Sequence, residues 1–208
     1  MNNDPETNQT EPISDKSFNL LIQEMEKVFP ISNAFKRQLR PLLFEISCKK
    51  GSKILNAGAK QRIVWFMLEG LAREIKEAEY HLNKKTTWIW SDLAFIYVVP
   101  GFFDQEPTLS TIKTITATKM VFISYENWKI LKETYEETEK LTEKIRTAYE
   151  LERQRHANDI HQLSTTDLYL KHKDFLKTLF PHLQLQYIAE YLGMSADTLG
   201  KLRKRFLD

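Results

Sequence analysis

The chain is poor in cysteine, because Cys48 is the only one among its 208 residues. A single thiol excludes an internal disulfide and any iron–sulfur cluster held by several thiolates. The sequence also contains no apolar run of the roughly 20 residues that a membrane span needs. The polar first residues hold no apolar segment of the kind found in secretory signals. We therefore expect a cytoplasmic protein with no membrane partner, in which residues 1–17 form a disordered leader.

Signatures of catalysis are missing as well. The sequence has no glycine-rich phosphate loop and no nucleophile elbow. Its titratable residues near the carboxyl end, His156, Asp159, His161, His172 and Asp174, are scattered along charged helical segments. Their spacings do not put two ligands on one helix face beside a fixed carboxylate. We predict that the protein is not an enzyme and has no metal site and no cofactor.

Hydrophobic residues make up 42% of the chain, which is enough for a packed core. Two short amphipathic helices are expected after the leader, the second capped by Ser32. From Ile46 to Ser124, short runs rich in Val, Ile, Thr, Trp and Phe are punctuated by glycines at strand-and-turn spacing. These runs predict an antiparallel sheet or barrel, so we assign residues 18–124 to an α+β domain.

Residues 125–162 are predicted to form one long charged helix. A seam with helical spacing runs along it: Leu131, Tyr135, Thr138, Leu141, Ile145, Ala148 and Glu152. A helix of this length cannot bury its whole stripe against a small barrel, which favours pairing with a second copy of the chain. The alternative is an exposed helix stabilised by charged pairs along its surface.

Residues 163–208 are predicted to form a compact helical unit that ends in a helix-turn-helix. Ser164 and Asp167 resemble a capping box at its start. Each constrained position of the motif holds a suitable residue type: Ile188, Ala189, Leu192, Gly193, Met194, Ser195, Leu199 and Leu202. Gly193 can adopt the left-handed backbone of a tight turn, and Ser195 can cap the second helix.

The remaining positions of that second helix form a small, polar and basic surface. We take this surface as the candidate DNA-binding set: Ser195, Ala196, Asp197, Thr198, Gly200, Lys201, Arg203, Lys204 and Arg205. A helix fits the major groove, where Asp197 can accept from cytosine and Lys201 can donate to guanine. The plainer alternative is a helical hairpin with a basic, solvated end, since the helix dipole alone favours cations there.

At this point the sequence resembles the Crp/Fnr-type transcription regulators, in particular their short variety. The stretch "YIAEYLGMSADTLGKLRKR" (187–205) carries most of the resemblance. The stretch "KKGSKILNAGAKQRIVWFMLEGLAREI" (49–75) has the glycine spacing of the family's β-roll. The resemblance implies a jelly-roll-like sensor domain, a dimerisation helix over 125–162 and a winged-helix-like DNA-binding domain.

The family's cyclic-nucleotide site is not preserved in this sequence. The resemblance places Tyr97 and Val98 where the family has a Gly-Glu pair, and Thr108 and Leu109 where it has Arg-Ser. A buried phosphate needs a fixed cation, so we expect a degenerate pocket that does not respond to cyclic AMP. His81 is a weak candidate for a haem ligand. Most of the aromatic residues in this region are expected to form ordinary core.

Together these features predict a homodimer that reads a near-palindromic site in double-stranded DNA. An unidentified small effector, apolar or aromatic, and RNA polymerase are further candidate partners. The alternative function is a ligand-sensing or scaffold protein whose helical end binds another protein.

Overall fold

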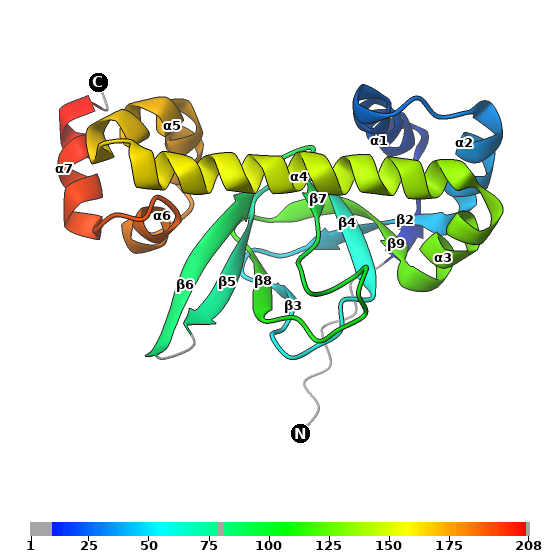
Figure 1. Ribbon diagram of the computed structural model, residues 1–208, viewed down its shortest axis with the longest axis horizontal. Coiled ribbons are helices and arrows are strands. Elements are labelled where there is room, and N and C mark those ends of the chain that lie inside the picture. The colour runs from blue at the N-terminus through cyan, green and yellow to red at the C-terminus, as the bar shows by residue number, and fades with distance from the viewer. Residues whose placement is uncertain (1–9, 79–80, 207–208) are drawn as a thin grey trace.

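The structure is a computed structural model that describes residues 10–78 and 81–206. Its strands form two antiparallel sheets, over which one long helix passes (Figure 1). The first sheet has the order β1–β2–β9–β4–β7, with bounds Thr10–Pro12, Leu43–Cys48, Thr118–Ser124, Ile63–Glu69 and Phe95–Ile96. The second has the order β3–β8–β5–β6, with bounds Lys53–Leu55, Ser110–Thr114, Ala72–Ala78 and His81–Trp90.

Alternating side chains of the first sheet enter two different cores. Trp65 belongs to the interior of the roll, whereas its neighbour Phe66 packs with the amino-terminal helices on the other face. This is the alternation that a strand produces, because successive side chains point to opposite faces. The roll predicted for this region is confirmed.

The helices are α1 (Asp15–Val28), α2 (Asn33–Leu39), the short 3-10 turn η1 (Arg40–Leu42), α3 (Tyr125–Thr134), α4 (Glu136–Gln162), α5 (Thr165–Leu179), α6 (Leu185–Tyr191) and α7 (Ala196–Phe206). Serine side chains cap several of them by accepting a backbone N–H three residues on. The predicted caps at Ser32 and Ser164 are confirmed, with N–H to Oγ distances of 3.1 and 3.2 Å. No helix in the described part of the chain is long and apolar enough to span a membrane.

Two boundary predictions are wrong. Residues 10–17, expected in a disordered leader, form β1 and the start of α1, because β1 pairs with β2 and Ser14 caps the helix. Residues 1–9 of that leader lie outside the described part. The single helix over 125–162 is two helices, since Tyr135 adopts an extended conformation (φ −129°) between α3 and α4.

Most residues of the predicted seam pack against other parts of the same chain. Leu131, Thr138 and Leu141 are buried, and the two leucines pack in the core that α1 forms with the first sheet. The amino-terminal helices thus cover a stripe that we expected a second copy to cover. Only the later seam positions, Ala148 and Glu152, are exposed.

The carboxyl-terminal unit consists of helices alone. After Ser124 the structure shows no strand up to residue 206, so the wing implied by the resemblance is absent from this part of the chain. Instead α6 lies beside β6, at the end of α4 (Figure 1). The strand that helps to enclose the sensor roll therefore also contacts the helix-turn-helix.

Candidate nucleic-acid interface and the interior of the roll

Helices α6 and α7 form the predicted helix-turn-helix. Its apolar positions are almost fully buried: Ile188, Ala189, Leu192, Leu199 and Leu202. Met194 also turns back toward this core, and its backbone N–H donates to the carbonyl oxygen of Ala189 at 3.0 Å. The apolar positions predicted from the sequence spacing are thus the residues that pack in the core of this unit.

The turn between the two helices depends on glycine and serine. Gly193 has φ +63°, and a Cβ placed there would lie 2.7 Å from Cγ2 of Ile160 on α4. Both the backbone conformation and the space therefore require glycine. Ser195 caps α7, because its Oγ accepts the N–H of Thr198 at 3.0 Å.

One face of α7 is left to solvent. Most of the candidate DNA-binding set is exposed on it: Ser195, Asp197, Lys201, Arg203, Lys204 and Arg205. Ala196 and Thr198 are half-buried. Nζ of Lys201 lies 2.7 Å from Oδ2 of Asp197, one helical turn away. The two side chains expected to read bases are therefore adjacent, and each must leave the other to bind a base.

Gly200 differs from the expectation. It is half-buried, and a Cβ there would point at Leu185 of α6, 3.5 Å from its Cδ2. That distance is an ordinary van der Waals contact, so the site accommodates an alanine. Gly200 thus lies on the flank of α7 that packs on α6, not on its open face.

Helix α6 packs on β6, the edge strand of its sheet. β6 is the last strand of its sheet, and the backbone N–H of Thr86 donates to Oε2 of Glu190 at 2.8 Å. The guanidinium carbon of Arg73 lies 3.7 Å from the ring centroid of Tyr187. The ring centroids of Trp88 and Tyr191 are 6.0 Å apart. The edge strand is therefore covered by a helix, which satisfies its outward N–H.

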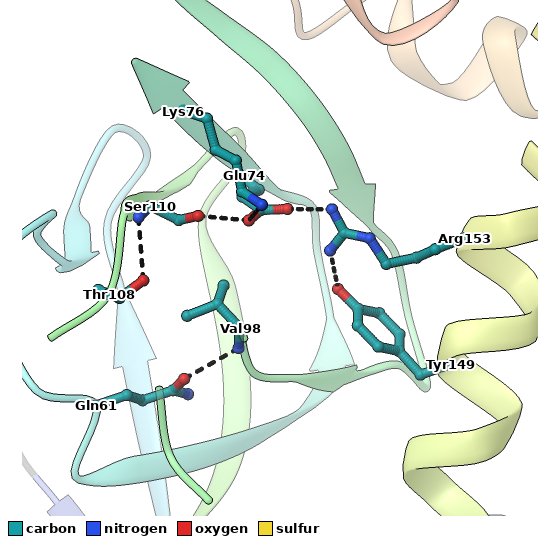
Figure 2. A network of polar contacts seen from close by, with 8 residues as sticks. All are labelled: Gln61, Glu74, Lys76, Val98, Thr108, Ser110, Tyr149 and Arg153. Atoms are coloured by element: carbon teal, nitrogen blue, oxygen red, sulfur yellow. Dashed lines mark hydrogen bonds and ion pairs between the residues drawn. The ribbon is translucent and has the colours of Figure 1, made fainter. Parts of the chain in front are cut away.

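A buried ion pair occupies the interior of the roll (Figure 2). Glu74 of β5 is only 1% exposed, and its Oε2 lies 2.5 Å from Nη2 of Arg153, which reaches in from α4. Oε1 of the same carboxylate accepts from the hydroxyl of Ser110 at 2.5 Å. Arg153 also donates to the hydroxyl of Tyr149 at 2.6 Å. The carboxylate and the guanidinium are thus paired with each other, and Ser110 of the roll and Tyr149 of α4 provide further hydrogen bonds.

The electrostatics of this cluster favour the charged state of both partners. Burial alone would raise the pKa of Glu74, but the positive charges of Arg153 and Lys76 outweigh it and lower that pKa. Burial would likewise lower the pKa of Arg153, and the charge of Glu74 reverses this effect. Such a pair is costly to break, because either partner alone would be an uncompensated charge.

The four residues expected around a degenerate pocket do not come together as one site. Tyr97, Val98 and Thr108 are buried, whereas Leu109 is 66% exposed. The backbone N–H of Val98 donates to the side chain of Gln61 at 3.0 Å (Figure 2). Thr108 accepts the N–H of Ser110 at 3.0 Å. The side chain of His81 lies outside the described part.

Sequence reasoning missed the pair that lies at the centre of the roll. Little in the sequence indicated it, because Glu74 lies in a strand that also carries Arg73 and Lys76. The sequence pattern did not distinguish Arg153, because a charged helix carries several arginines that are expected to face solvent. Only the path of α4 over the roll brings it to Glu74.

The ring of His156 stacks on that of Tyr191 and meets the ring of His172 edge to face. Nε2 of His156 donates to the carbonyl oxygen of Tyr191 at 2.9 Å, and the two rings stack at 4.2 Å. Burial lowers the pKa of both His156 and His172. In the described residues no group of three or more His, Cys, Asp or Glu side chains is arranged to hold a metal ion.

Comparison with known proteins places the fold. No protein-family model and no curated protein matches the chain. Among solved structures, a putative Crp/Fnr-family transcriptional regulator from Eubacterium rectale superposes with a TM-score of 0.63 at 15% identity, covering 87% of this chain and 88% of that one. The c-di-GMP-responsive global regulator CLP from Xanthomonas campestris gives 0.62 at 15% identity, covering 85% and 92%.

The roll has matches of its own. A cyclic nucleotide-binding domain from Methylobacillus flagellatus gives a TM-score of 0.61 at 18% identity, covering 70% of this chain and 82% of that one. At these identities the likeness concerns the fold. The chain therefore has a fold like that of the Crp/Fnr-family regulators and of the cyclic nucleotide-binding domain.

Proposed function

We propose that the protein is a homodimeric DNA-binding transcription regulator that does not respond to cyclic AMP. The observation that carries this proposal is the helix-turn-helix with an open, small, polar and basic face on α7. A helix of this kind fits the major groove, and two copies related by a dyad read half-sites about 34 Å apart. The fold shared with Crp/Fnr regulators supports the same function.

The alternative, a scaffold that binds another protein through this end, is supported less well. Protein interfaces centre on large apolar or aromatic anchors. The exposed large apolar side chains of the described chain are Val28, Leu93, Val99, Leu109, Ile130, Leu151 and Leu170, and α7 carries none of them. Reversing the charges of Lys201 and Lys204 separates the two functions, because only DNA binding requires those charges.

The proposed lack of a cyclic AMP response is supported by the pairing of Glu74 with Arg153 inside the roll. Glu74 and Arg153 already neutralise each other there. An incoming cyclic phosphate would have to separate them and would leave Glu74 buried beside a second negative charge. We therefore propose that α4 is held on the roll by the chain's own side chains rather than by a nucleotide.

The dimer is proposed to form along the second half of α4. That part exposes Ala148 and Leu151. Ala148 lines a groove of about 210 Å³ together with Val28 and Leu93, and Leu151 lies outside that lining. Leu151→Glu should convert the dimer to monomer in sedimentation. Leu170→Glu is the matched control, because both leucines are 44% exposed but Leu170 lies on α5.

The test of DNA binding is a selection of duplexes from a random pool, followed by anisotropy titrations at several salt concentrations. We expect one near-palindromic sequence to bind best, with an affinity that falls steeply between about 50 and 200 mM salt. Equal binding to all sequences, or no salt-dependent binding, would rule the proposal out.

A further inference from the structure

The outer face of the second sheet carries a row of cations. In the register of this sheet, Lys53 of β3 lies directly opposite Lys113 of β8, which in turn lies opposite Arg73 of β5. Arg73 points outward, because its neighbour Glu74 points into the roll and successive side chains of a strand alternate between faces. Directly opposed side chains share a face, so all three cations lie on the outside. We call Lys53, Lys113 and Arg73 the basic row.

No ion pair neutralises the two lysines of the basic row within the described part of the chain. The side chain of Lys113 extends along the turn before β3, where a Cβ on Gly51 would lie 3.7 Å from its Cε, and the same turn exposes Lys50. The first sheet differs, because Nζ of Lys119 there lies 2.6 Å from Oε2 of Glu45. Like charges directly opposite each other destabilise a sheet. An anionic partner would offset this cost.

The basic row is continuous with the helix-turn-helix. The guanidinium carbon of Arg73 lies 3.7 Å from the ring centroid of Tyr187 on α6, and α6 packs in turn against α7. Figure 1 shows α6 between α7 and the second sheet. Arg73 itself is only 9% exposed, so a partner would meet chiefly Lys53 and Lys113. A polyanion bound to α7 can therefore reach the basic row if it extends past α6.

We propose that the basic row binds phosphates of double-stranded DNA outside the half-site that α7 contacts, an inference that rests on the proposed function. B-DNA carries one phosphate per about 1.7 Å of its axis. The basic row spans two strand spacings, or about 10 Å, so several phosphates of a flanking segment come within its reach. Phosphate contacts carry no base information. The basic row would thus add affinity without changing the preferred sequence.

The test compares two duplexes that both contain the selected near-palindromic sequence. The short one ends at the outer edges of the half-sites, and the long one extends further by one helical turn, about 10 base pairs, at each end. The full chain should bind the long duplex more tightly and with a steeper salt dependence, because each added phosphate contact increases the slope by about 0.9. Binding of the short duplex tests the proposed function alone, and the difference between the duplexes tests the basic row.

Lys53→Glu should reduce this difference and leave the fold intact. Each protomer of the dimer loses one contact, so affinity for the long duplex should fall roughly tenfold and its salt slope should decrease by about 2. The short duplex should bind as before. The new carboxylate would lie opposite Lys113 and should raise Tm by about 1–3 °C, which separates lost binding from misfolding. Lys16→Glu makes the same charge change at an exposed lysine of α1 and should alter neither affinity.

Two results with the duplexes would overturn the proposal: equal affinity for the short and the long one, or a gain from the long one that Lys53→Glu retains in full. Phosphatidylserine vesicles provide a different polyanionic partner. If the chain binds these vesicles, Lys53→Glu abolishes that binding and the long duplex gives no gain, the basic row faces a lipid surface and the proposal is likewise overturned.

Discussion

The carboxyl-terminal helices and the roll of this chain place their charged groups in opposite ways. On α7 the charged side chains face solvent. Lys201 and Asp197 pair with each other there, and either one could leave that pair to bind a base. In the roll the charged pair is enclosed, and Glu74 and Arg153 are satisfied by the chain itself. This difference fits the proposal that α7 binds DNA while the Glu74–Arg153 pair stabilises the roll.

The buried pair should give the largest effect of any single change. Glu74→Ala leaves the Arg153 guanidinium without its carboxylate. Because the Arg153 side chain is 26% exposed and can reach water, the expected cost is about 2–3 kcal/mol, below that of a fully buried pair. Urea unfolding should show this loss. Arg155→Ala, an exposed arginine two residues further along α4, should change stability by no more than about 0.5 kcal/mol.

A small effect for Glu74→Ala would mean that the roll interior is open to water. The contrast between the two ends would then disappear, and a ligand could occupy the roll.

The two glycines of the reading end should behave in opposite ways. Gly193→Ala forces a Cβ into Ile160 at a left-handed position and should destabilise the protein by about 1–3 kcal/mol. Gly200→Ala lies in a helix with room for the methyl group, so it should stabilise by about 0.5–1 kcal/mol. Thermal unfolding measures both, and equal shifts for the two variants would contradict the assigned turn.

The exposed face of α7 is tested by Lys201→Ala. Losing one base contact should weaken binding to the selected duplex by about 1–3 kcal/mol and relax the preference at one base pair. Lys177→Ala serves as control, because Lys177 also pairs with an aspartate, Asp174, but lies on α5. If both variants bind like the unmodified protein, α7 is not the reading helix.

Acid should weaken the junction between α4 and α6 by a smaller amount. The pKa of His156 and of His172 is lowered by burial, so the folded state holds both histidines neutral. The unfolded chain takes up protons first as the pH falls through about 6.5, and the free energy of unfolding then decreases. Urea midpoints at about pH 7.5 and about pH 5.5 measure this change.

His156→Gln should reduce that pH dependence. His161→Gln, a change at an exposed residue of the same helix, should retain it in full.

Much of this organisation was predictable where local rules decide the structure. The caps at Ser32, Ser164 and Ser195 and the turn at Gly193 depend on neighbouring residues alone, and each was confirmed. The break at Tyr135 was not predicted, because the helical spacing runs straight through it. The apolar stripe identified a buried face of the helix but not what covers it.

The roll was harder to predict because the contact between Glu74 and Arg153 is made across the fold. Glu74 and Arg153 are 79 residues apart, and only the path of α4 brings them together. The same holds for the edge of β6, where Thr86 meets Glu190 across 104 residues. Sequence resemblance indicated which ligand groups are missing from the roll, but not what replaces them.

The most direct measurement is the affinity of the purified protein for its selected duplex, with no added ligand and again with saturating cyclic AMP. Because Arg153 is already paired with Glu74, we predict tight, salt-dependent binding in the absence of ligand and the same dissociation constant in its presence. Binding that appears only with cyclic AMP, or that strengthens tenfold on adding it, would contradict this account.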